Sequence, residues 1–354
     1  MKKIVLTGGG TAGHVTPNLA LLSALKEAGF EVTYIGSYSG IEKQLAEDHG
    51  IPYVGVATGK FRRYLDVKNL TDPFKVIKGY KEAKAFLKSY RPDVVFSKGG
   101  FVSVPVVRAA AALKIPCIIH ESDMTPGLAN KLCYGAAKKV CCNFPETVSL
   151  LPEGKAVLTG TPIRAELFTG DAIKGKAFCG FTDDKPVLMV TGGSLGAVAV
   201  NEAIRAALPT LLEKYNVCHL CGKNKKDDAL TGTPGYVQFE YVKDEMKDLF
   251  AMADVIISRA GANAICEILA LKKPNILIPL PAKSSRGDQL LNAESFKKQG
   301  YSAVLIQDAI TPASLSETVD TVYSKKDTYI SAMEKSTLQD AISIIVSLVK
   351  ELAD

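Results

Sequence analysis

Residues 4–13 read IVLTGGGTAG, and this stretch decides the fold. Four residues typical of a strand run into a glycine-rich turn, and residues 18–28 then have the pattern of a helix. This is a phosphate-binding βα unit, because the N–H groups of the turn and the positive end of the helix face the same point. Residues 188–194, LMVTGGS, repeat the pattern before a second helix over 201–213. The chain therefore contains two such units.

Short runs rich in Val and Ile alternate with helical patterns along the rest of the chain. Continuous apolar strands separated by helices predict parallel sheets covered on both faces. The predicted fold class is therefore α/β, with two doubly wound, Rossmann-like domains and a cleft between them. The expected strands are residues 4–7, 31–35, 53–57, 93–97, 117–120 and 140–143 in the first domain, and 187–191, 217–220, 237–241, 255–258, 275–279 and 303–306 in the second.

The domain boundary is predicted from a segment rich in Gly and Pro. Residues 158–164 make a plausible linker, which places the first domain at residues 1–160 and the second at 161–339. The last segment, residues 340–354, has the pattern of an amphipathic helix and follows the completed second sheet. We expect this helix to pack back on the first domain.

Length and composition exclude several classes of protein. The chain has 354 residues, of which 47% are hydrophobic and 23% charged, as expected for two globular domains. The longest apolar run, residues 102–119, carries Arg108 and Lys114, so no segment is apolar enough to span a bilayer. Residues 1–10 lack the apolar core of a signal peptide, and we expect a protein of the cytoplasm.

The eight cysteines do not predict a disulfide framework, because such scaffolds are small and much denser in cysteine. Residues 218–221, CHLC, resemble half of a zinc site, but a second pair of ligands is missing and the segment has the pattern of a strand. We expect buried, unreactive thiols and no metal ion.

The positive charge is concentrated in one segment. Residues 60–91 carry ten basic and three acidic side chains, an excess larger than the net charge of +6 of the whole chain. A local excess indicates an anionic partner at this segment and argues against a protein coated for nucleic acid. An ordinary solvated lysine face is the alternative. The predicted helix of this segment carries a basic stripe at spacings of three or four residues, formed by Lys75, Lys78, Lys81, Lys84 and Lys88.

The first glycine turn, residues 8–13, matches a dinucleotide-binding pattern. A dehydrogenase would also need an acidic residue at the end of the second strand to hold a ribose, and residues 35–37, IGS, provide none. His14 directly follows the turn, where the helix dipole disfavours a protonated imidazole. His14 is therefore a candidate base, or a hydrogen-bond donor, beside a phosphate site.

Two further motifs end strands of the first domain. Residues 98–101, KGGF, follow the fourth strand, and residues 120–123, HESD, end the fifth. Both lie at the carboxyl edge of the sheet, where open α/β sheets bind their ligands. Glu121 and Asp123 are further candidates for the proton acceptor, or they cap the helix that follows.

In the second domain, residues 258–263, SRAGAN, form another strand-turn-helix pattern, and Glu267 lies about one helical turn further on. A carboxylate there can accept hydrogen bonds from both ribose hydroxyls of a nucleotide whose phosphate meets the turn. The alternative is a surface glutamate that stabilises the helix dipole. Gln289 and Asn292 fall on one face of the next helix, from which they could bind sugar hydroxyls.

Six blocks of sequence, in this order, resemble the MurG family. Members of that family are UDP-N-acetylglucosamine:N-acetylmuramyl-(pentapeptide) pyrophosphoryl-undecaprenol N-acetylglucosaminyltransferases of peptidoglycan synthesis. The resemblance runs nearly end to end, and six ordered blocks are far more specific than any single motif. The blocks are residues 8–14, 120–123 with 126–130, 160–164, 192–196, 258–261 and 288–293.

The resemblance implies a GT-B fold, with the donor UDP-N-acetylglucosamine in the second domain and the lipid-linked acceptor and the membrane contact in the first. It implies that an acceptor hydroxyl attacks the anomeric carbon of the donor, that UDP leaves, and that inversion converts lipid I into lipid II. The sequence has no D-x-D motif at a strand end, so we expect neither a cofactor nor a metal ion. Helix N-termini and Arg164 would then meet the diphosphate charge.

The resemblance also assigns roles to single residues. Ala12 stands where many members have glycine, so its backbone must avoid positive φ, and Asp123 stands where many have asparagine. The predicted contacts to UDP-N-acetylglucosamine are Thr11, Ala12, Gly13, Arg164, Ser194, Glu267, Gln289 and Asn292. The predicted contacts to the acceptor diphosphate are Gly10, Gly99 and Gly100, and the candidate proton acceptors are His14, Glu121 and Asp123. The predicted membrane contacts are Lys60, Phe61, Arg62, Arg63, Tyr64, Lys75 and Lys78.

The expected partners are UDP-N-acetylglucosamine, lipid I, an anionic membrane surface and other cell-wall synthesis proteins, met at the cytoplasmic face of the membrane. Three alternatives remain open. A UDP-N-acetylglucosamine 2-epimerase needs no lipid acceptor and would leave the basic segment unexplained. A UDP-sugar:diacylglycerol glycosyltransferase shares the membrane argument. A sugar-nucleotide sensor without catalysis is the third alternative, and His14 beside a second crevice argues against it.

Overall fold

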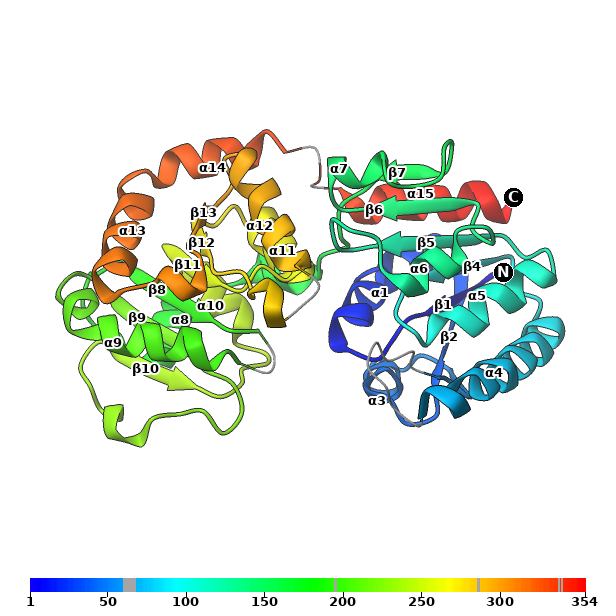
Figure 1. The fold of residues 1–354 in the computed structure, drawn as a ribbon, viewed down its shortest axis with the longest axis horizontal. Helices are drawn as coiled ribbons and strands as arrows, with labels where there is room; N and C mark the ends of the chain where they lie inside the picture. The colour runs from blue at the N-terminus through cyan, green and yellow to red at the C-terminus, as the bar shows by residue number, and fades with distance from the viewer. Residues whose placement is uncertain (60–67, 194–195, 285–286, 337, 339) are drawn as a thin grey trace. The chain divides into compact units, whose positions relative to one another are not determined.

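The chain forms two compact units in the computed structural model, which describes residues 1–59, 68–193, 196–284, 287–336, 338 and 340–354. The first unit comprises Met1–Arg164 with Leu338–Asp354, and the second comprises Ala165–Thr337. Each is built on one parallel sheet with helices on both faces (Figure 1). The predicted pair of doubly wound α/β domains is therefore confirmed. The first unit runs a few residues beyond the predicted boundary at 160.

The first unit has a seven-stranded sheet in the order β3-β2-β1-β4-β5-β6-β7, and all neighbours are parallel. The strand order reverses between β1 and β4, which pair although β2 and β3 lie between them in sequence. The loops after these two strands therefore leave the sheet side by side. The strands are β1 (Lys2–Thr7), β2 (Phe30–Ser37), β3 (Tyr53–Val56), β4 (Val94–Ser97), β5 (Cys117–Glu121), β6 (Lys139–Cys142) and β7 (Ala156–Leu158).

Successive strand residues point to opposite faces of this sheet, which gives the first unit two cores. Ile4 and Leu6 pack on one face with side chains of α2 and α15, whereas Val5 packs on the other face with side chains of α4 and α5. The helices are α1 (Thr16–Ala20), α2 (Leu22–Glu27), α3 (Ile41–Asp48), α4 (Lys68–Tyr90), α5 (Ser103–Ala112), α6 (Leu128–Cys133), α7 (Pro145–Val148) and α15 (Ala341–Ala353).

The final helix, α15, belongs to the first unit. Ile345 and Val349 are fully buried in the core that also contains Ile4. The side chains of Lys2 and Asp354 form an ion pair, so the two ends of the chain meet (Figure 1). No helix in the described part of the chain is both long and apolar enough to cross a membrane.

The second unit has a six-stranded parallel sheet in the order β10-β9-β8-β11-β12-β13, which reverses between β8 and β11. The strands are β8 (Val187–Thr191), β9 (Asn216–Leu220), β10 (Tyr236–Phe239), β11 (Val255–Ser258), β12 (Asn275–Leu277) and β13 (Ala303–Val304). The helices are α8 (Ala172–Cys179), α9 (Val198–Lys214), α10 (Met246–Met252), α11 (Ala262–Ala270), α12 (Asp288–Lys298), α13 (Pro312–Ser324) and α14 (Lys326–Glu334).

Each predicted strand is present, with its ends shifted by at most one or two residues. The prediction missed β7, because three residues are too few to show a periodic pattern. The helix expected over residues 18–28 is divided into α1 and α2. Five short 3-10 helices complete the described structure: η1 (Ala12–His14), η2 (Ala165–Thr169), η3 (Asp228–Leu230), η4 (Ala282–Ser284) and η5 (Gln307–Ala309).

Candidate functional site

Two glycine turns meet where the strand order of the first sheet reverses. The turn after β1 begins at Gly8, and the turn after β4 contains Gly99 and Gly100. A Cβ atom on Gly100 would lie 2.3 Å from the carbonyl oxygen of Gly9 and 3.1 Å from the ring of His14. Gly100 also has a φ of 81°, which disfavours any side chain. The absence of a side chain at this position therefore lets the two turns touch.

A buried carboxylate lies beneath the first turn. Glu42, in α3, is fully buried and accepts hydrogen bonds from the N–H groups of Gly10, at 3.2 Å, and Ser37, at 3.0 Å. The Ser37 hydroxyl donates to the same carboxylate. Cβ atoms on Gly9 and Gly36 would lie 2.5 Å and 2.7 Å from Glu42 atoms, so these glycines make room for the carboxylate.

Glu42 reduces the number of backbone N–H groups of the first turn that a ligand could bind. The N–H of Gly10, predicted to contact a diphosphate, is directed to Glu42 instead. The N–H of Gly99 donates to the Ser97 hydroxyl at 3.1 Å. Within the described residues the N–H of Gly100 has no hydrogen-bond partner. Of the three glycines predicted to bind the acceptor diphosphate, Gly100 is therefore the one whose N–H is available.

His14 is half-buried at the end of η1 and has a defined tautomer. Its Nδ1 lies 3.2 Å from the carbonyl oxygen of Lys98. A carbonyl oxygen only accepts, so Nδ1 carries the proton of the neutral ring and the lone pair is on Nε2. Thr11 is exposed at the start of η1, and Ala12 is helical and avoids positive φ, as predicted.

A buried lysine and a buried histidine lie under the second turn, and neither was predicted as a site residue. Lys98 Nζ lies 3.0 Å from His120 Nδ1 and donates to the Ser122 hydroxyl. His120 Nε2 lies 2.8 Å from the carbonyl oxygen of Gly160. Burial and then the Lys98 charge hold the pKa of His120 well below its usual range. His120 is thus a neutral ring that links β4 to the segment after β7.

Glu121 is engaged by the loop that follows β5 and by Asn130 of α6. Its buried carboxylate accepts hydrogen bonds from the Gly127 N–H and the Asn130 amide, both at 2.9 Å, and from the Asp123 N–H at 3.3 Å. Burial raises the pKa of Glu121, against the effect of the Asn130 and Gly127 hydrogen bonds. This carboxylate holds the loop before α6. Asp123 is half-buried in that loop.

The predicted donor contacts of the second unit lie around the turn after β11. Glu267 is half-buried in α11. The Gln289 side chain accepts a hydrogen bond from the Leu280 N–H at 3.0 Å. Asn292 is fully buried and donates to the Ala260 carbonyl oxygen at 3.2 Å. Asn292 thus ties α12 to the turn, and its burial does not favour the predicted contact to a sugar hydroxyl.

Three other predicted donor contacts, Arg164, Ser194 and Gly13, lie elsewhere in the chain. Arg164 is half-buried and is the last residue of the first unit. Ser194 lies outside the described residues, as do Lys60, Phe61, Arg62, Arg63 and Tyr64 of the predicted membrane contact. Gly13 lies within η1, between Ala12 and His14.

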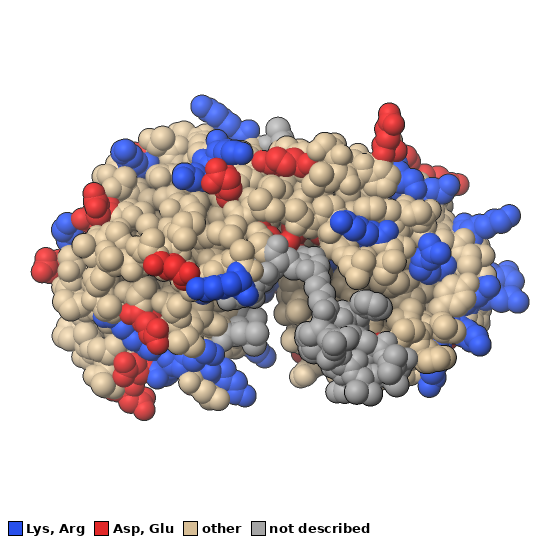
Figure 2. All heavy atoms as spheres, viewed as in Figure 1, with Lys and Arg blue, Asp and Glu red and all other residues tan. Residues whose placement is uncertain are grey.

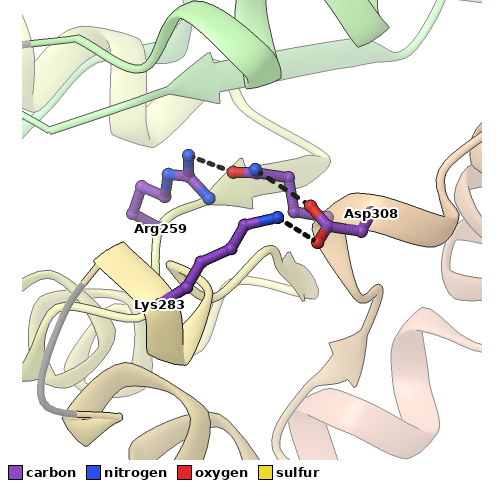
Figure 3. Close-up of polar contacts among 4 residues, drawn as sticks. Arg259, Lys283 and Asp308 are labelled. Atoms are coloured by element: carbon purple, nitrogen blue, oxygen red, sulfur yellow. Dashed lines mark hydrogen bonds and ion pairs between the residues drawn. The ribbon is translucent and has the colours of Figure 1, made fainter.

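Arg259 directly follows β11 and stabilises the turn after that strand through its side-chain hydrogen bonds (Figure 3). Its Nη1 donates to the Ile278 carbonyl oxygen at 3.0 Å, and its Nη2 donates to Gln307 Oε1 at 2.6 Å. Burial lowers the pKa of Arg259. Asp308 accepts from the Gln307 amide at 3.5 Å and from Lys283 Nζ at 2.8 Å. The exposed Lys283–Asp308 pair adds little stability but connects η4 to η5.

Within the described residues, no group of three or more His, Cys, Asp or Glu side chains is arranged to hold a metal ion. All eight cysteines are free thiols and buried, as predicted. Burial raises the pKa of Cys141 to about 12, which keeps this thiol protonated and unreactive.

Comparison with known proteins identifies the family. Residues 4–142 match the Glycosyltransferase family 28 N-terminal domain, and residues 187–348 match the Glycosyltransferase family 28 C-terminal domain. The UDP-N-acetylglucosamine--N-acetylmuramyl-(pentapeptide) pyrophosphoryl-undecaprenol N-acetylglucosamine transferase of Lachnospira eligens is 63% identical over 351 residues, 99% of each chain. The protein of that name from Clostridium botulinum strain Loch Maree is 54% identical over 351 residues, again 99% of each chain. This chain belongs to the MurG family.

Solved structures agree with the MurG assignment. The crystal structure of Acinetobacter baumannii MurG matches with a TM-score of 0.78 at 28% identity and covers 99% of this chain and 100% of that one. The calicheamicin glycosyltransferase CalG4 matches with a TM-score of 0.72 at 16% identity over 99% and 98% of the two chains, which shows the fold alone. The predicted GT-B class and the predicted family are thus confirmed, and the chain is a glycosyltransferase.

The contacts of Glu42 yield a prediction about the first glycine turn. Replacing Glu42 with Ala leaves three partly buried donors, the N–H groups of Gly10 and Ser37 and the Ser37 hydroxyl, without this acceptor, at a cost of about 1–3 kcal/mol for each one that water cannot reach. We expect a lower free energy of unfolding and an acceptor KM raised at least about tenfold. Urea unfolding followed by circular dichroism and steady-state kinetics measure the two effects.

Glu47→Ala is the matched control, because Glu47 is exposed on the same helix. It should behave as the unmodified protein in both measurements. A Glu42→Ala protein with normal stability and a normal acceptor KM would show that this carboxylate does not shape the turn.

Proposed function

We propose that the chain transfers N-acetylglucosamine from UDP-N-acetylglucosamine to the muramyl 4-hydroxyl of lipid I, undecaprenyl-pyrophosphoryl-N-acetylmuramyl-pentapeptide, and so forms lipid II. The carrying observation is the full-length 63% identity to the L. eligens protein with that enzymatic name. The adjoining glycine turns of the first sheet support the proposal, since a diphosphate ligand needs N–H donors at one point. We further propose that the enzyme acts at the cytoplasmic face of the membrane.

The chemistry proposed is a single inverting displacement. The acceptor hydroxyl gives up its proton as its oxygen bonds to the anomeric carbon, and UDP leaves with the electrons of the broken bond. His14 is the proposed base, because the hydrogen bond from Nδ1 to the Lys98 carbonyl leaves Nε2 as the proton acceptor. Glu121 is a weaker candidate for the base, because its carboxylate already accepts hydrogen bonds from Gly127 and Asn130. Asp123 is the alternative candidate.

For the donor we propose a site at the reversal of the second sheet. The turns after β8 and β11 leave adjacent strands there, as the two turns of the first sheet do. Glu267 is proposed to accept hydrogen bonds from the ribose hydroxyls, and Gln289 to bind a sugar hydroxyl through its amide. The Arg259 hydrogen bonds support this turn from below. Arg164 is proposed to offset the charge of the leaving diphosphate.

One assay tests the function against its rivals. Radiolabelled UDP-N-acetylglucosamine is offered with lipid I, with diacylglycerol, or alone. We expect label to enter a lipid product only when lipid I is present. Labelled diacylglycerol would identify the rival transferase, and conversion of the nucleotide sugar alone into its 2-epimer would identify an epimerase. Donor binding without any of these products would identify the protein as a sugar-nucleotide sensor without catalysis.

The role of His14 is tested by replacing it with Ala. If His14 is the general base, kcat should fall by about 10² to 10⁴ while donor affinity, measured by calorimetry, stays normal. His49→Ala is the control, because His49 is an exposed histidine at the end of α3 and should not affect kcat. If kcat holds and only the acceptor KM rises, His14 is instead a hydrogen-bond donor to the diphosphate.

We infer that the enzyme reaches its lipid acceptor by peripheral membrane binding through α4 and α6. Four large apolar side chains are exposed there: Phe74 by 73%, Ile77 by 54%, Leu128 by 44% and Leu132 by 54%. Apolar side chains of this kind insert into the boundary between headgroups and acyl chains. The apolar patch therefore adds an attachment that the lysine stripe alone does not provide.

Cations surround this patch. Figure 2 shows Lys and Arg side chains on the part of the first unit where α4 and α5 lie in Figure 1. Lys75 Nζ lies 2.9 Å from Asp72 and Lys78 Nζ lies 3.7 Å from Glu82, so part of their charge is neutralised within α4. Arg108 and Lys131 are exposed and form no ion pair with any described residue. These two residues thus strengthen the predicted basic surface.

Membrane binding is tested by replacing Lys75, Lys78, Arg108 and Lys131 with Gln. Each cation near an anionic leaflet is worth about 1 kcal/mol, so affinity for phosphatidylglycerol vesicles at low salt should fall by at least about tenfold. Turnover of a water-soluble, short-chain acceptor reports that the fold is intact. The control replaces four exposed lysines of the second unit, Lys174, Lys226, Lys243 and Lys325. Equal sedimentation of both variants with vesicles would place the membrane contact elsewhere.

A further inference from the structure

An apolar groove lies between α4, α5 and α6 of the first unit. One cavity of about 500 Å³ is lined by Pro73, Val76 and Ile77 of α4, by Phe101 and Val104, and by Leu132 of α6. A second cavity, of about 910 Å³, shares Val76, Ile77, Val104 and Leu132 with the first and extends to Arg108 and Lys131. The two cavities therefore adjoin; together they are called the groove, and each has the volume of a ligand site.

Phe101 connects this groove to the glycine turns. It follows Gly100 directly in the chain and lines the first cavity. A Cβ atom on Gly10 would lie 2.5 Å from the Phe101 ring, so this ring packs against the first turn. Phe101 thus contacts the first turn and lines the groove, one residue after the available N–H of Gly100.

We propose that the groove binds the first isoprene units of the lipid-linked acceptor while its diphosphate lies at the Gly100 turn. This inference rests on the proposed function. In a polyprenyl diphosphate the apolar chain begins at a phosphate oxygen, so its site must place anion donors beside apolar surface. The Gly100 turn and the groove behind Phe101 meet this requirement.

The far end of the groove fits the exit of the chain into the bilayer. Arg108 and Lys131 lie at that end and carry charge that suits the phosphates of surrounding lipids. The acyl chain of a phospholipid is the competing occupant. It would put its phosphate at these two cations and leave the connection through Phe101 to the glycine turns unused. Because Phe101 contacts the first glycine turn and also lines the groove, the structure favours the polyprenyl chain of the acceptor over a phospholipid acyl chain.

The gain in acceptor affinity from the groove depends on whether the isoprene units move into it from a bilayer or from water. Moving an isoprene unit from a bilayer into the groove exchanges one apolar environment for another, so it changes affinity little. Moving it from water into the groove should increase kcat/KM by roughly tenfold or more for each isoprene unit buried. The groove is therefore best tested with water-soluble acceptors and without membranes.

The experiment compares acceptor analogues that carry two, three and four isoprene units, using the full-length enzyme. We expect kcat/KM to rise with each unit. Val104→Phe narrows the groove beside Phe101, and Leu132→Glu places a charge at its exposed rim, where it does not endanger folding. In both variants the ratio of kcat/KM between the longest and the shortest acceptor should fall towards one.

Leu150→Glu is the matched control, because Leu150 is an exposed leucine of the first unit that lines neither cavity. Its ratio should equal that of the unmodified enzyme. The proposal is overturned if the unmodified enzyme shows no dependence on chain length, or if the dependence persists in both groove variants. Failure to transfer sugar to any acceptor, lipid I included, would instead overturn the proposed function.

Discussion

The close approach of two glycine turns is the constraint on which the rest of the first unit depends. Gly100 lies against the carbonyl oxygen of Gly9 and the ring of His14, at a distance that leaves no space for a side chain. Parallel pairing of β1 and β4 brings the turns to the same edge of the sheet, and glycine lets them touch. One available N–H, one histidine of fixed tautomer and the start of an apolar groove therefore lie at a single point.

Buried charged groups hold these turns in place. Glu42 takes the N–H of the first turn, Lys98 binds His120 under the second, and Glu121 takes the N–H of the loop before α6. A buried charge is tolerated only when hydrogen bonds replace its water, and each of these groups has several partners. The cost of removing one partner is correspondingly high, so these residues hold the shape of the site.

The proposed amphiphilic acceptor would account for the polar and apolar features that adjoin in this unit. Its diphosphate requires N–H donors and its polyprenyl chain requires apolar surface, and Phe101 contacts both regions. Val76 and Tyr80 of α4 line the groove, and Tyr80 also packs against the core. Ala83 and Leu87, nearer the end of α4, are fully buried in that core. The helix thus serves stability at one end and the proposed acceptor and membrane contacts at the other.

The sequence by itself determined the fold and the family, and it predicted where ligands bind. Apolar runs followed by glycine turns, as at residues 4–7 and 187–191, are local patterns. Such patterns can be recognised from the sequence alone. What only the tertiary structure decided is which groups are already engaged. The Glu42 carboxylate of α3 accepts from Ser37 at the end of β2, and Asn292 donates to the Ala260 carbonyl oxygen. Lys98 and His120 were visible as motif residues, but their contact depends on the order of the strands. Hydrogen-bond partners far apart in sequence are set by packing, which spacing along the chain does not encode.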